Sequence, residues 1–322
     1  MDHFQIFYDS LTEALWFANL NPFFDFNSPQ NQYIQIGRRG NNPRIIEQLT
    51  SYDKPDIILL KNDVPVLTIE KTQEVPTGHN VGQRFARLVK SIELDVPVIY
   101  FFPFDAKKHG AYEGICNLNI RLLDAAQKIF NLHRTPLLCV NWLTDASGEI
   151  ITDGSEDYHM RSLLNSYITS GFNKHCQLFM AQLSNMQQEY YTRLQRRPSY
   201  ANLPPSVVRY PTNVFIRNFG ITNVPSSFMN RPYTYVYSMD MTPAKCKRQD
   251  PYTGTAFIYD YQVCRNGINV GDKCNNLVLN FPSLTKEIWA CNNPNDSTTK
   301  SCNWYLTANL FTFNNGHLWI RG

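Results

Sequence analysis

The sequence carries little net charge. Among its 322 residues, 30 Lys and Arg stand against 27 Asp and Glu, which gives a formal charge of +3 at pH 7. So small a charge offers no overall basic signal for nucleic acid, although a local basic channel depends only on where the charges lie. Hydrophobic residues make up 43 % of the chain and charged residues 18 %, a balance that is typical of a globular protein and excludes a disordered one.

Long hydrophobic runs are absent as well. The longest, Val96 to Phe104, is interrupted by prolines and is far too short to cross a bilayer, so we expect no membrane partner. The first twenty residues include Asp2, Asp9 and Glu13 and lack the basic stretch that opens a secretory signal. These absences predict a soluble protein of the cytoplasm.

Closely spaced cysteine pairs are missing too. None of the eight cysteines has C-x-x-C spacing, and structural zinc sites usually need such pairs. Without a secretory signal we expect a reducing compartment and free thiols. Buried thiols are therefore favoured over zinc for the five in the last third of the chain, Cys246, Cys264, Cys274, Cys291 and Cys302.

Several common catalytic motifs do not occur. The chain has no G-x-S-x-G, no G-x-x-x-x-G-K-[ST] and no H-E-x-x-H, and it shows no internal repeats. Their absence weakens the interpretation as an unrelated α/β hydrolase or a structural partner, without removing it.

Apolar periodicity predicts alternating helices and strands up to about residue 197. Residues 1–20 suggest an amphipathic helix in which Ser10 and Glu13 have the form of a capping box. Further helices are predicted over 43–52, 80–94, 111–132 and 158–196, and strands over 66–72, 96–102 and 135–142. The order strand, helix, strand over 66–102 predicts a right-handed crossover and a parallel pair.

The composition changes near residues 198–205, where Pro, Ser and Asn suggest a linker. Beyond it, β-branched and aromatic runs over 234–239, 255–263 and 277–281 are separated by turn residues. We therefore predict two domains: an α/β domain over 1–197 and a β-rich module over 198–322, which would serve substrate recognition or assembly.

Two acids mark the ends of neighbouring apolar runs. Asp56 directly precedes Ile57 to Leu60, and Glu70 directly follows Val64 to Ile69, with a polar turn between the runs. In a hairpin the two carboxylates would lie at the same end of the sheet, where they could supply the hard oxygen ligands that Mg²⁺ requires. The alternation of a strand places Thr72 on the face of Glu70 and Lys71 on the other face.

A helix with basic residues is predicted directly after these strands. His79 and Asn80 lie near its start, and Gln83, Arg84 and Arg87 follow on one side, where they could contact phosphates of a nucleic acid. The same residues could equally be the solvated face of an amphipathic helix.

Pro55-Asp56, a hairpin, Glu70 and a following helix and strand together resemble the PD-(D/E)XK nuclease superfamily, which includes type II restriction endonucleases. The resemblance covers roughly residues 43–103. It implies a restriction-endonuclease-like mixed sheet flanked by helices, and Mg²⁺-dependent hydrolysis of double-stranded DNA. Asp56 and Glu70 would hold the metal, and Glu47 could match an additional acid that some members carry.

One position departs from the family pattern. Where the pattern has a lysine two residues after the second acid, this sequence has Thr72, and Lys71 or Lys90 are the nearest alternatives. The predicted catalytic set is Asp56, Glu70 and Thr72, in a Mg²⁺-dependent endodeoxyribonuclease of the restriction or defence type. Because two DNA strands require two cuts, a homodimer is plausible. The alternative is a nucleic-acid-binding protein that keeps the fold without the chemistry.

Overall fold

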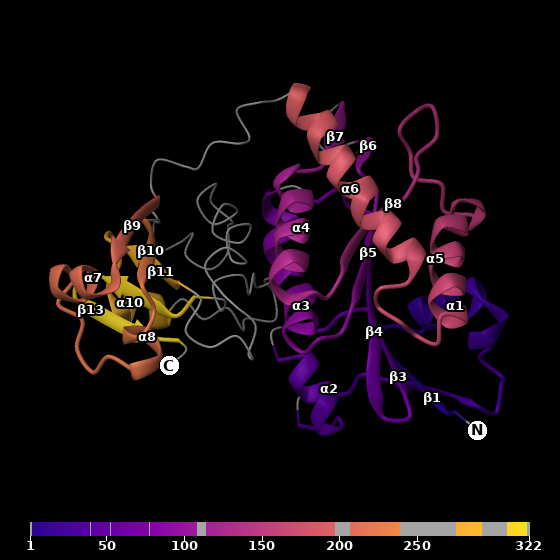
Figure 1. Ribbon diagram of the computed structural model, residues 1–322, viewed down its shortest axis with the longest axis horizontal. Coiled ribbons are helices and arrows are strands. Elements are labelled where there is room, and N and C mark those ends of the chain that lie inside the picture. Colours follow the sequence, from indigo (N-terminus) through magenta and orange to yellow (C-terminus); the bar gives the residue numbers. More distant parts are fainter. Residues whose placement is uncertain are drawn as a thin grey trace. The chain divides into compact units, whose positions relative to one another are not determined.

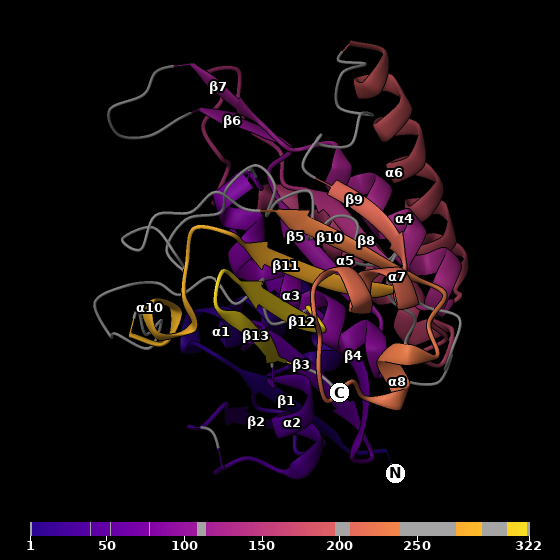
Figure 2. The same cartoon turned by 90° about the vertical axis from the view of Figure 1, so that its left-hand side faces the viewer.

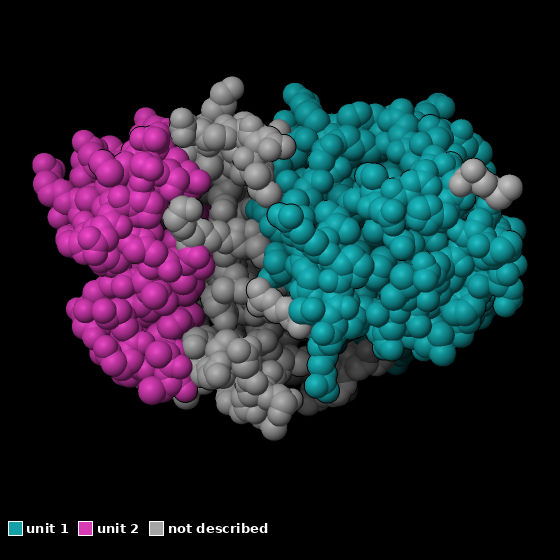
Figure 3. Space-filling model, turned by 90° about the horizontal axis from the view of Figure 1, so that it is seen from below, with its two compact units in different colours: residues 1–77, 87–197 teal, residues 78–86, 198–322 magenta. Residues whose placement is uncertain are grey.

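The structure is a computed structural model that describes residues 2–38, 40–51, 53–76, 78–107, 114–196, 207–238, 275–291 and 308–320. The chain divides into two compact units, which Figure 3 shows in different colours. Unit 1 consists of residues 1–77 and 87–197, and unit 2 of residues 78–86 and 198–322.

Unit 1 is built on a six-stranded mixed sheet with the order β2-β1-β3-β4-β5-β8 (Figure 1). The strands β1, β3 and β4 are antiparallel neighbours, whereas β1–β2, β4–β5 and β5–β8 are parallel pairs. The predicted hairpin and the predicted parallel pair are thereby confirmed, as is the α/β class. The strands span Phe4–Tyr8 (β1), Asn31–Gln35 (β2), Ile57–Lys61 (β3), Val64–Lys71 (β4), Val98–Phe102 (β5) and Leu137–Asn141 (β8).

Helices cover both faces of this sheet. Figure 1 shows α3 and α4 on one side and α1 and α5 on the other. None of the described helices is long and apolar enough to cross a membrane. The helices of this part of the chain span Leu11–Leu20 (α1), Arg44–Leu49 (α2), Gly78–Glu93 (α3), Arg121–His133 (α4), Tyr158–Thr169 (α5) and Gln177–Arg196 (α6), with 3-10 turns at Pro22–Phe24 (η1) and Ser155–Asp157 (η2).

The central strands are buried almost throughout. Ile57 to Leu60 of β3 and all five residues of β5 are fully or nearly fully buried, as expected for strands that are covered on both faces. Against β3, the helix α2 packs Ile46 and Leu49 into one core cluster with Ile58 and Leu60. A sheet that is buried on both faces holds the residues at the ends of its strands in fixed positions.

The edge strand β8 is protected by side chains of α6. The amide nitrogen of Gln182 donates to the carbonyl oxygen of Cys139 at 2.6 Å, and the sulfur of Met186 accepts from the Cys139 N–H at 3.2 Å. Because an unpaired strand edge invites association with other strands, these contacts close the sheet on this side.

The predicted N-terminal helix is correct only in its second half. Residues 4–8 form β1, because Phe4 and Ile6 alternate with Gln5 and the strand lies between β2 and β3 in the sheet. The capping box of α1 is confirmed: the Glu13 N–H donates to Ser10 Oγ at 3.4 Å, and the Ser10 N–H donates to Glu13 Oε2 at 2.9 Å.

Two other predicted helices also need correction. The helix predicted over 111–132 begins only at Arg121, since Ile115–Asn117 (β7) pairs with Asp105–Lys107 (β6) in a small antiparallel sheet. The tract predicted over 158–196 is two helices, α5 and α6. Gly171 and Phe172 between them have φ values of 71° and 67°, which no α-helix can accommodate.

Unit 2 contains a second mixed sheet, with the order β13-β12-β11-β10-β9, whose strands Figure 2 shows side by side. The runs predicted as strands over 234–239 and 277–281 form β10 and β11, and the run over 255–263 lies outside the described residues. Since β11 is parallel to both neighbours, this unit is not a simple β meander. Its elements span Val207–Pro211 (β9), Thr212–Asn218 (α7), Ser226–Met229 (α8), Tyr233–Ser238 (β10), Asn276–Phe281 (β11), Lys286–Cys291 (α10), Leu310–Phe313 (β12) and Gly316–Trp319 (β13).

The cysteines that the structure describes are free thiols. Cys139 and Cys176 are buried, Cys116 is half-buried and Cys291 is exposed. The prediction of free thiols holds for these four, but the expected burial of Cys291 is wrong, since it lies at the exposed end of α10. The other four lie outside the described residues: Cys246, Cys264, Cys274 and Cys302.

Candidate active site

The hairpin brings Asp56 and Glu70 to the same end of the sheet. Its last pair joins Ile57 of β3 to Ile69 of β4, so the two acids lie one position beyond, on facing strands. Both are buried, with 7 % of Asp56 and 1 % of Glu70 exposed. The arrangement agrees with the hairpin geometry expected from the sequence. It brings two acidic side chains together in a site that is shielded from water.

Asp56 is held in an environment that opposes its ionisation. Burial raises the pKa of this carboxyl well above its ordinary value, and the nearby charges of Glu70 and Glu13 raise it further. The Lys71 N–H donates to Asp56 Oδ2 at 2.6 Å and partly offsets the shift, as does the charge of Arg87. No described residue donates a hydrogen bond to the other carboxyl oxygen, Oδ1.

Arg87 of α3 neutralises much of this negative charge. Its Nη1 lies 3.1 Å from both oxygens of Glu70, and its Nη2 pairs with Asp53. Burial lowers the pKa of the guanidinium, but Glu70 and Asp53 raise it by more, so the net pKa lies above its usual range. Arg87 is expected from the sequence to contact nucleic acid, and in the structure it lies in an ion-pair network with these acids.

The start of α3 carries the other residues expected to bind nucleic acid. His79, Asn80 and Gln83 lie in its first turns, but their side chains are outside what the structure describes. Arg84 lies one turn before Arg87 and is half-buried. In the second half of the helix, Ser91 donates to Thr68 of β4 at 3.0 Å, which helps to fix α3 against the strand that bears Glu70.

Thr72, at the position of the family lysine, is also buried. Its N–H donates to the Phe101 carbonyl at 3.0 Å, and its hydroxyl accepts from the Glu74 N–H at 3.1 Å. The first bond continues the pairing of β4 with β5, and the second engages the hydroxyl oxygen in the turn that follows β4. The second alternative lysine, Lys90, pairs with Glu93 at 3.6 Å on its own helix.

Lys71 lies on the opposite face of the strand, as the alternation predicts. Its ammonium is 4.6 Å from the ring centre of Trp16 and 4.7 Å from that of Trp142, and both indoles stack on Phe101. Burial lowers its pKa, although the charges of Asp157 and Glu13 oppose that shift. Lys71 is therefore held in an aromatic cage, away from the face of Glu70.

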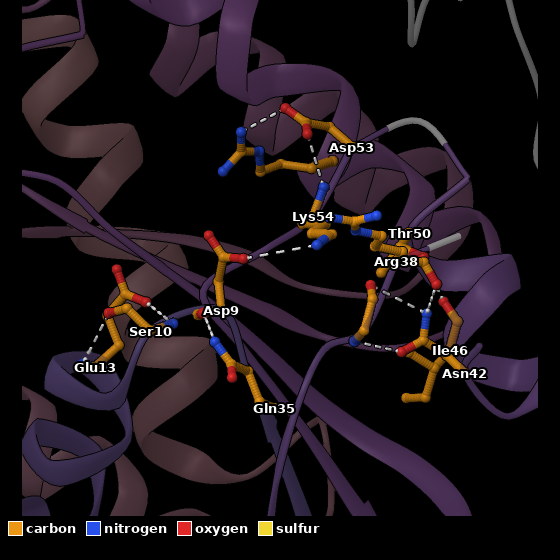
Figure 4. Close-up of polar contacts among 12 residues, drawn as sticks. Asp9, Ser10, Glu13, Gln35, Arg38, Asn42, Ile46, Thr50, Asp53 and Lys54 are labelled. Carbon is orange, nitrogen blue, oxygen red and sulfur yellow. Dashed lines mark hydrogen bonds and ion pairs between the residues drawn. The ribbon is translucent and has the colours of Figure 1, made fainter. Parts of the chain in front are cut away.

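Polar contacts before β3 hold the loop that leads to Asp56. Figure 4 shows Lys54 next to Asp53, whose carboxyl accepts from the Lys54 N–H at 2.8 Å, and next to Asp9, at 4.0 Å from the ammonium. Glu13 is engaged in its capping box with Ser10 in the same view. Asp53 was not among the residues predicted for this site, although it lies only three positions before Asp56 in the sequence.

Glu47 is not part of this constellation. Its carboxylate accepts from the N–H groups of Gly40 and Asn42, at 2.8 and 3.1 Å, and from the Asn42 side chain at 2.8 Å. These bonds close the loop before α2, so Glu47 has a structural role here.

The carboxylates of this site offer few ligands to a hard divalent cation. Among the residues that the structure describes, no three His, Cys, Asp or Glu side chains converge in a way that could hold a metal ion. Mg²⁺ needs fewer than three protein ligands, because it keeps several waters and is commonly bound through one or two carboxylates together with substrate phosphates. Asp56 and Glu70 suit that arrangement, since each oxygen of an ionised carboxylate can accept more than one bond.

Comparisons with known proteins add no assignment. Searches against protein-family models, curated proteins and solved structures find no match to this chain.

Proposed function

We propose that this protein is a Mg²⁺-dependent endonuclease that hydrolyses phosphodiester bonds of double-stranded DNA, with a restriction-endonuclease-like fold and a restriction or defence role in the cytoplasm. One observation carries the proposal: two buried carboxylates, Asp56 and Glu70, lie on facing strands at one end of the central sheet. The mixed sheet with helices on both faces agrees with the core that the resemblance implies.

The electrostatics of the pair favour a bound cation. Burying like charges together is costly, and the raised pKa of Asp56 expresses that cost. The positive charge of Arg87 offsets the negative charges of Glu70 and Asp53. Asp56, in contrast, has only the Lys71 N–H as a hydrogen-bond donor among the described residues. A cation beside Asp56 would therefore lower the energy of the folded state.

Asp56 and Glu70 would hold Mg²⁺ and orient it toward the phosphate. When bound, such an ion activates water and neutralises the charge that develops on the phosphate and the leaving oxygen. The positive charge of Arg87 would hold Glu70 in place and favour an anionic substrate nearby. Arg84 and the start of α3, with His79, Asn80 and Gln83, would contact the DNA backbone. Unit 2 would serve recognition or assembly, and a homodimer would deliver both cuts.

Cleavage of supercoiled plasmid DNA tests the proposal. With Mg²⁺ the wild-type protein should nick or linearise the plasmid, and EDTA should stop the reaction. Asp56→Ala and Glu70→Gln should each reduce the rate by at least about a hundredfold, the scale on which loss of a group that stabilises transition-state charge is felt. Asp63→Asn is the matched control, because Asp63 lies in the turn of the same hairpin and its side chain is 74 % exposed.

Unchanged cleavage by both the Asp56→Ala and Glu70→Gln variants would remove these acids from the chemistry. Loss of cleavage with Asp63→Asn as well would indicate a damaged hairpin instead of a lost catalyst. Circular dichroism of each variant separates these cases.

A second function is favoured by a specific observation. Arg87 Nη1 contacts both oxygens of Glu70, and Thr72 replaces the family lysine with its hydroxyl bonded to Glu74. Both features suit a nucleic-acid-binding protein that keeps a nuclease-like fold without its chemistry. Metal-independent DNA binding that weakens steeply with salt, without cleavage of any DNA, would establish this function in place of the first.

A further inference from the structure

A cavity of about 220 Å³ lies beside the carboxyl end of β8. It opens between that strand end and the helices α5 and α6, and no step proposed above uses it. Its lining combines aromatic, apolar and amide side chains: Phe104, Val140, Asn141, His159, Gln182, Asn185, Met186 and Glu189.

The floor of the cavity is formed by buried side chains. Val140 and Met186 are 2 % and 1 % exposed, and Phe104 is 6 % exposed. The guanidinium of Arg193 lies 5.7 Å from the Phe104 ring centre and is held by Asp105 and Glu189. A site with such a floor is formed before any ligand arrives, which reduces the ordering cost of binding.

The helix α6 supplies a polar stripe to one wall. Gln182, Asn185 and Glu189 recur at a spacing of three and four residues, so they share one face of the helix. A helix that packs against a sheet usually turns apolar residues toward it. Of the residues that α6 contributes to the cavity wall, Met186 is the apolar one. Gln182 also caps the edge of β8 and Glu189 also holds Arg193, so the exposed Asn185 is the one of the three whose polarity the described contacts do not account for.

Part of the hydrogen-bonding capacity of this wall remains open. Among the described residues, Gln182 uses its NH₂ group on Cys139 and keeps its carbonyl oxygen open, and Glu189 uses Oε1 on Arg193 and keeps Oε2 open. Asn141 uses its oxygen on the Phe104 N–H at 2.8 Å, which leaves its NH₂ group. Asn185 is exposed and has no hydrogen bond to its side chain among the described residues. The cavity thus offers several acceptors and two amide donors.

This combination suits one planar heterocycle with an exocyclic amino group. Asn and Gln amides pair with the N6 and N7 edge of adenine, and a carboxylate accepts from N4 of cytosine. The exposed ring of His159 provides a surface on which such a heterocycle could stack, above the buried ring of Phe104. The volume is below the roughly 300–1,000 Å³ of sites for drug-sized ligands, so it suits one base and not a stretch of chain.

The cavity lies on the same edge of the sheet as the acid pair. Glu70 of β4, Tyr100 of β5 and Cys139 of β8 are in register on parallel strands, and Asn141 follows at the end of β8. Two strand spacings amount to about 10 Å. Val140, which lines the cavity, is in register with Phe101 and Lys71 and so faces away from Glu70. A DNA strand at Asp56 and Glu70 would therefore have to cross the carboxyl ends of β5 and β8 to bring a nucleotide to the cavity.

We propose that this cavity binds a single nucleobase bearing an exocyclic amino group, adenine or cytosine, that is turned out of the DNA stack. A base inside a duplex cannot reach such a pocket, and enzymes that read or modify single bases extrude them in this way. The identity of the ligand rests on the proposed function, whereas the binding of the free base does not depend on the acid pair.

Ligand-observed NMR titrations of the full-length protein with adenosine, cytidine and thymidine test the proposal. Adenosine or cytidine should bind at least about fivefold more tightly than thymidine, which lacks the amino group, as expected for one or two hydrogen bonds. Asn185→Leu should weaken that binding by about fivefold, because it removes an open amide at an exposed helix position. Gln187→Leu is the matched control, since Gln187 is equally exposed on α6 and does not line the cavity.

The outcomes separate the two proposals. Absence of binding, equal binding of the three nucleosides, or equal affinities of wild type and Asn185→Leu would overturn the base pocket, even if Mg²⁺-dependent cleavage is found. Selective binding that Asn185→Leu weakens and Asp56→Asn leaves unchanged would support the pocket, even if no DNA is cleaved.

Discussion

Replacing Asp56 with asparagine separates the proposed chemistry from the stability of the fold. The carboxyl is 7 % exposed, and burial together with the charges of Glu70 and Glu13 raises its pKa. Asparagine has nearly the same shape, and its carbonyl oxygen can accept the Lys71 N–H that now bonds to Asp56 Oδ2 at 2.6 Å. The variant therefore keeps the packing and the hydrogen bond but removes a buried charge.

We expect Asp56→Asn to be more stable than the wild type by about 1 kcal/mol at pH 8, within the roughly 0.5–2 kcal/mol that relief of a strained functional site commonly gives. Two smaller effects reduce this gain in stability. The attraction to Arg87 is lost, and a bond to a neutral acceptor is weaker than one to a carboxylate. Cleavage should be lost in the same variant, so that stability and activity change in opposite directions.

The pH dependence gives the sign of the effect. The folded protein holds the Asp56 proton at pH values above the ordinary carboxyl value of 3.8, at which the unfolded chain releases it. The stabilisation from this group is therefore fully present below that value and is lost as the pH rises through the folded-state pKa. The advantage of Asp56→Asn should grow over that interval and stay constant above it.

Urea unfolding at a series of pH values, followed by circular dichroism, measures this difference, provided that the slope with urea is unchanged. If Asp56→Asn is less stable than the wild type at pH 8, or if the difference is independent of pH, the carboxyl is not electrostatically strained and the argument for a cation is refuted. Asp63→Asn, at an exposed turn position, should change stability by less than about 0.5 kcal/mol.

Two further substitutions test how the site is supported. Arg87→Ala should lower the free energy of unfolding by about 3–5 kcal/mol, because it removes the guanidinium that pairs with the buried Glu70 carboxylate; a loss below about 1 kcal/mol in urea unfolding would contradict that role. Gln182→Leu should cost about 1 kcal/mol, because the Cys139 carbonyl loses its donor. An equal loss with the exposed control Gln187→Leu would show that the edge contact contributes nothing.

The acid pair was predictable because its geometry is local. A two-strand hairpin determines which residues face each other, and period two determines the face, so Asp56 and Glu70 could be placed from the sequence alone. The partner of Glu70 could not be placed in that way. Whether Arg84, Arg87 or Lys90 reaches β4 depends on how α3 is rotated and displaced against the sheet, which tertiary packing decides.

The N-terminal strand was missed for a related reason. Phe4, Gln5 and Ile6 form too short an alternation to be told from the start of the helix that follows at Leu11. Only the pairing of β1 with β3 on one side and β2 on the other settles the matter, and those partners lie far along the chain. The capping box, by contrast, involves four consecutive residues and was found.

The charges on β4 themselves support a functional interpretation. The strand lies inside the sheet, between β3 and β5, yet its end carries Glu70 toward Arg87 and Lys71 toward two indoles. Apolar residues of similar volume at such positions are often as stabilising as a buried ion pair or more so, because charges must leave water. Structural demand alone therefore explains Ile69 but not its two charged successors. The loss of stability from burying these charges is understandable if Glu70 is needed to bind a ligand. For the same reason, Asp56→Asn on the facing strand is expected to be more stable than the wild type.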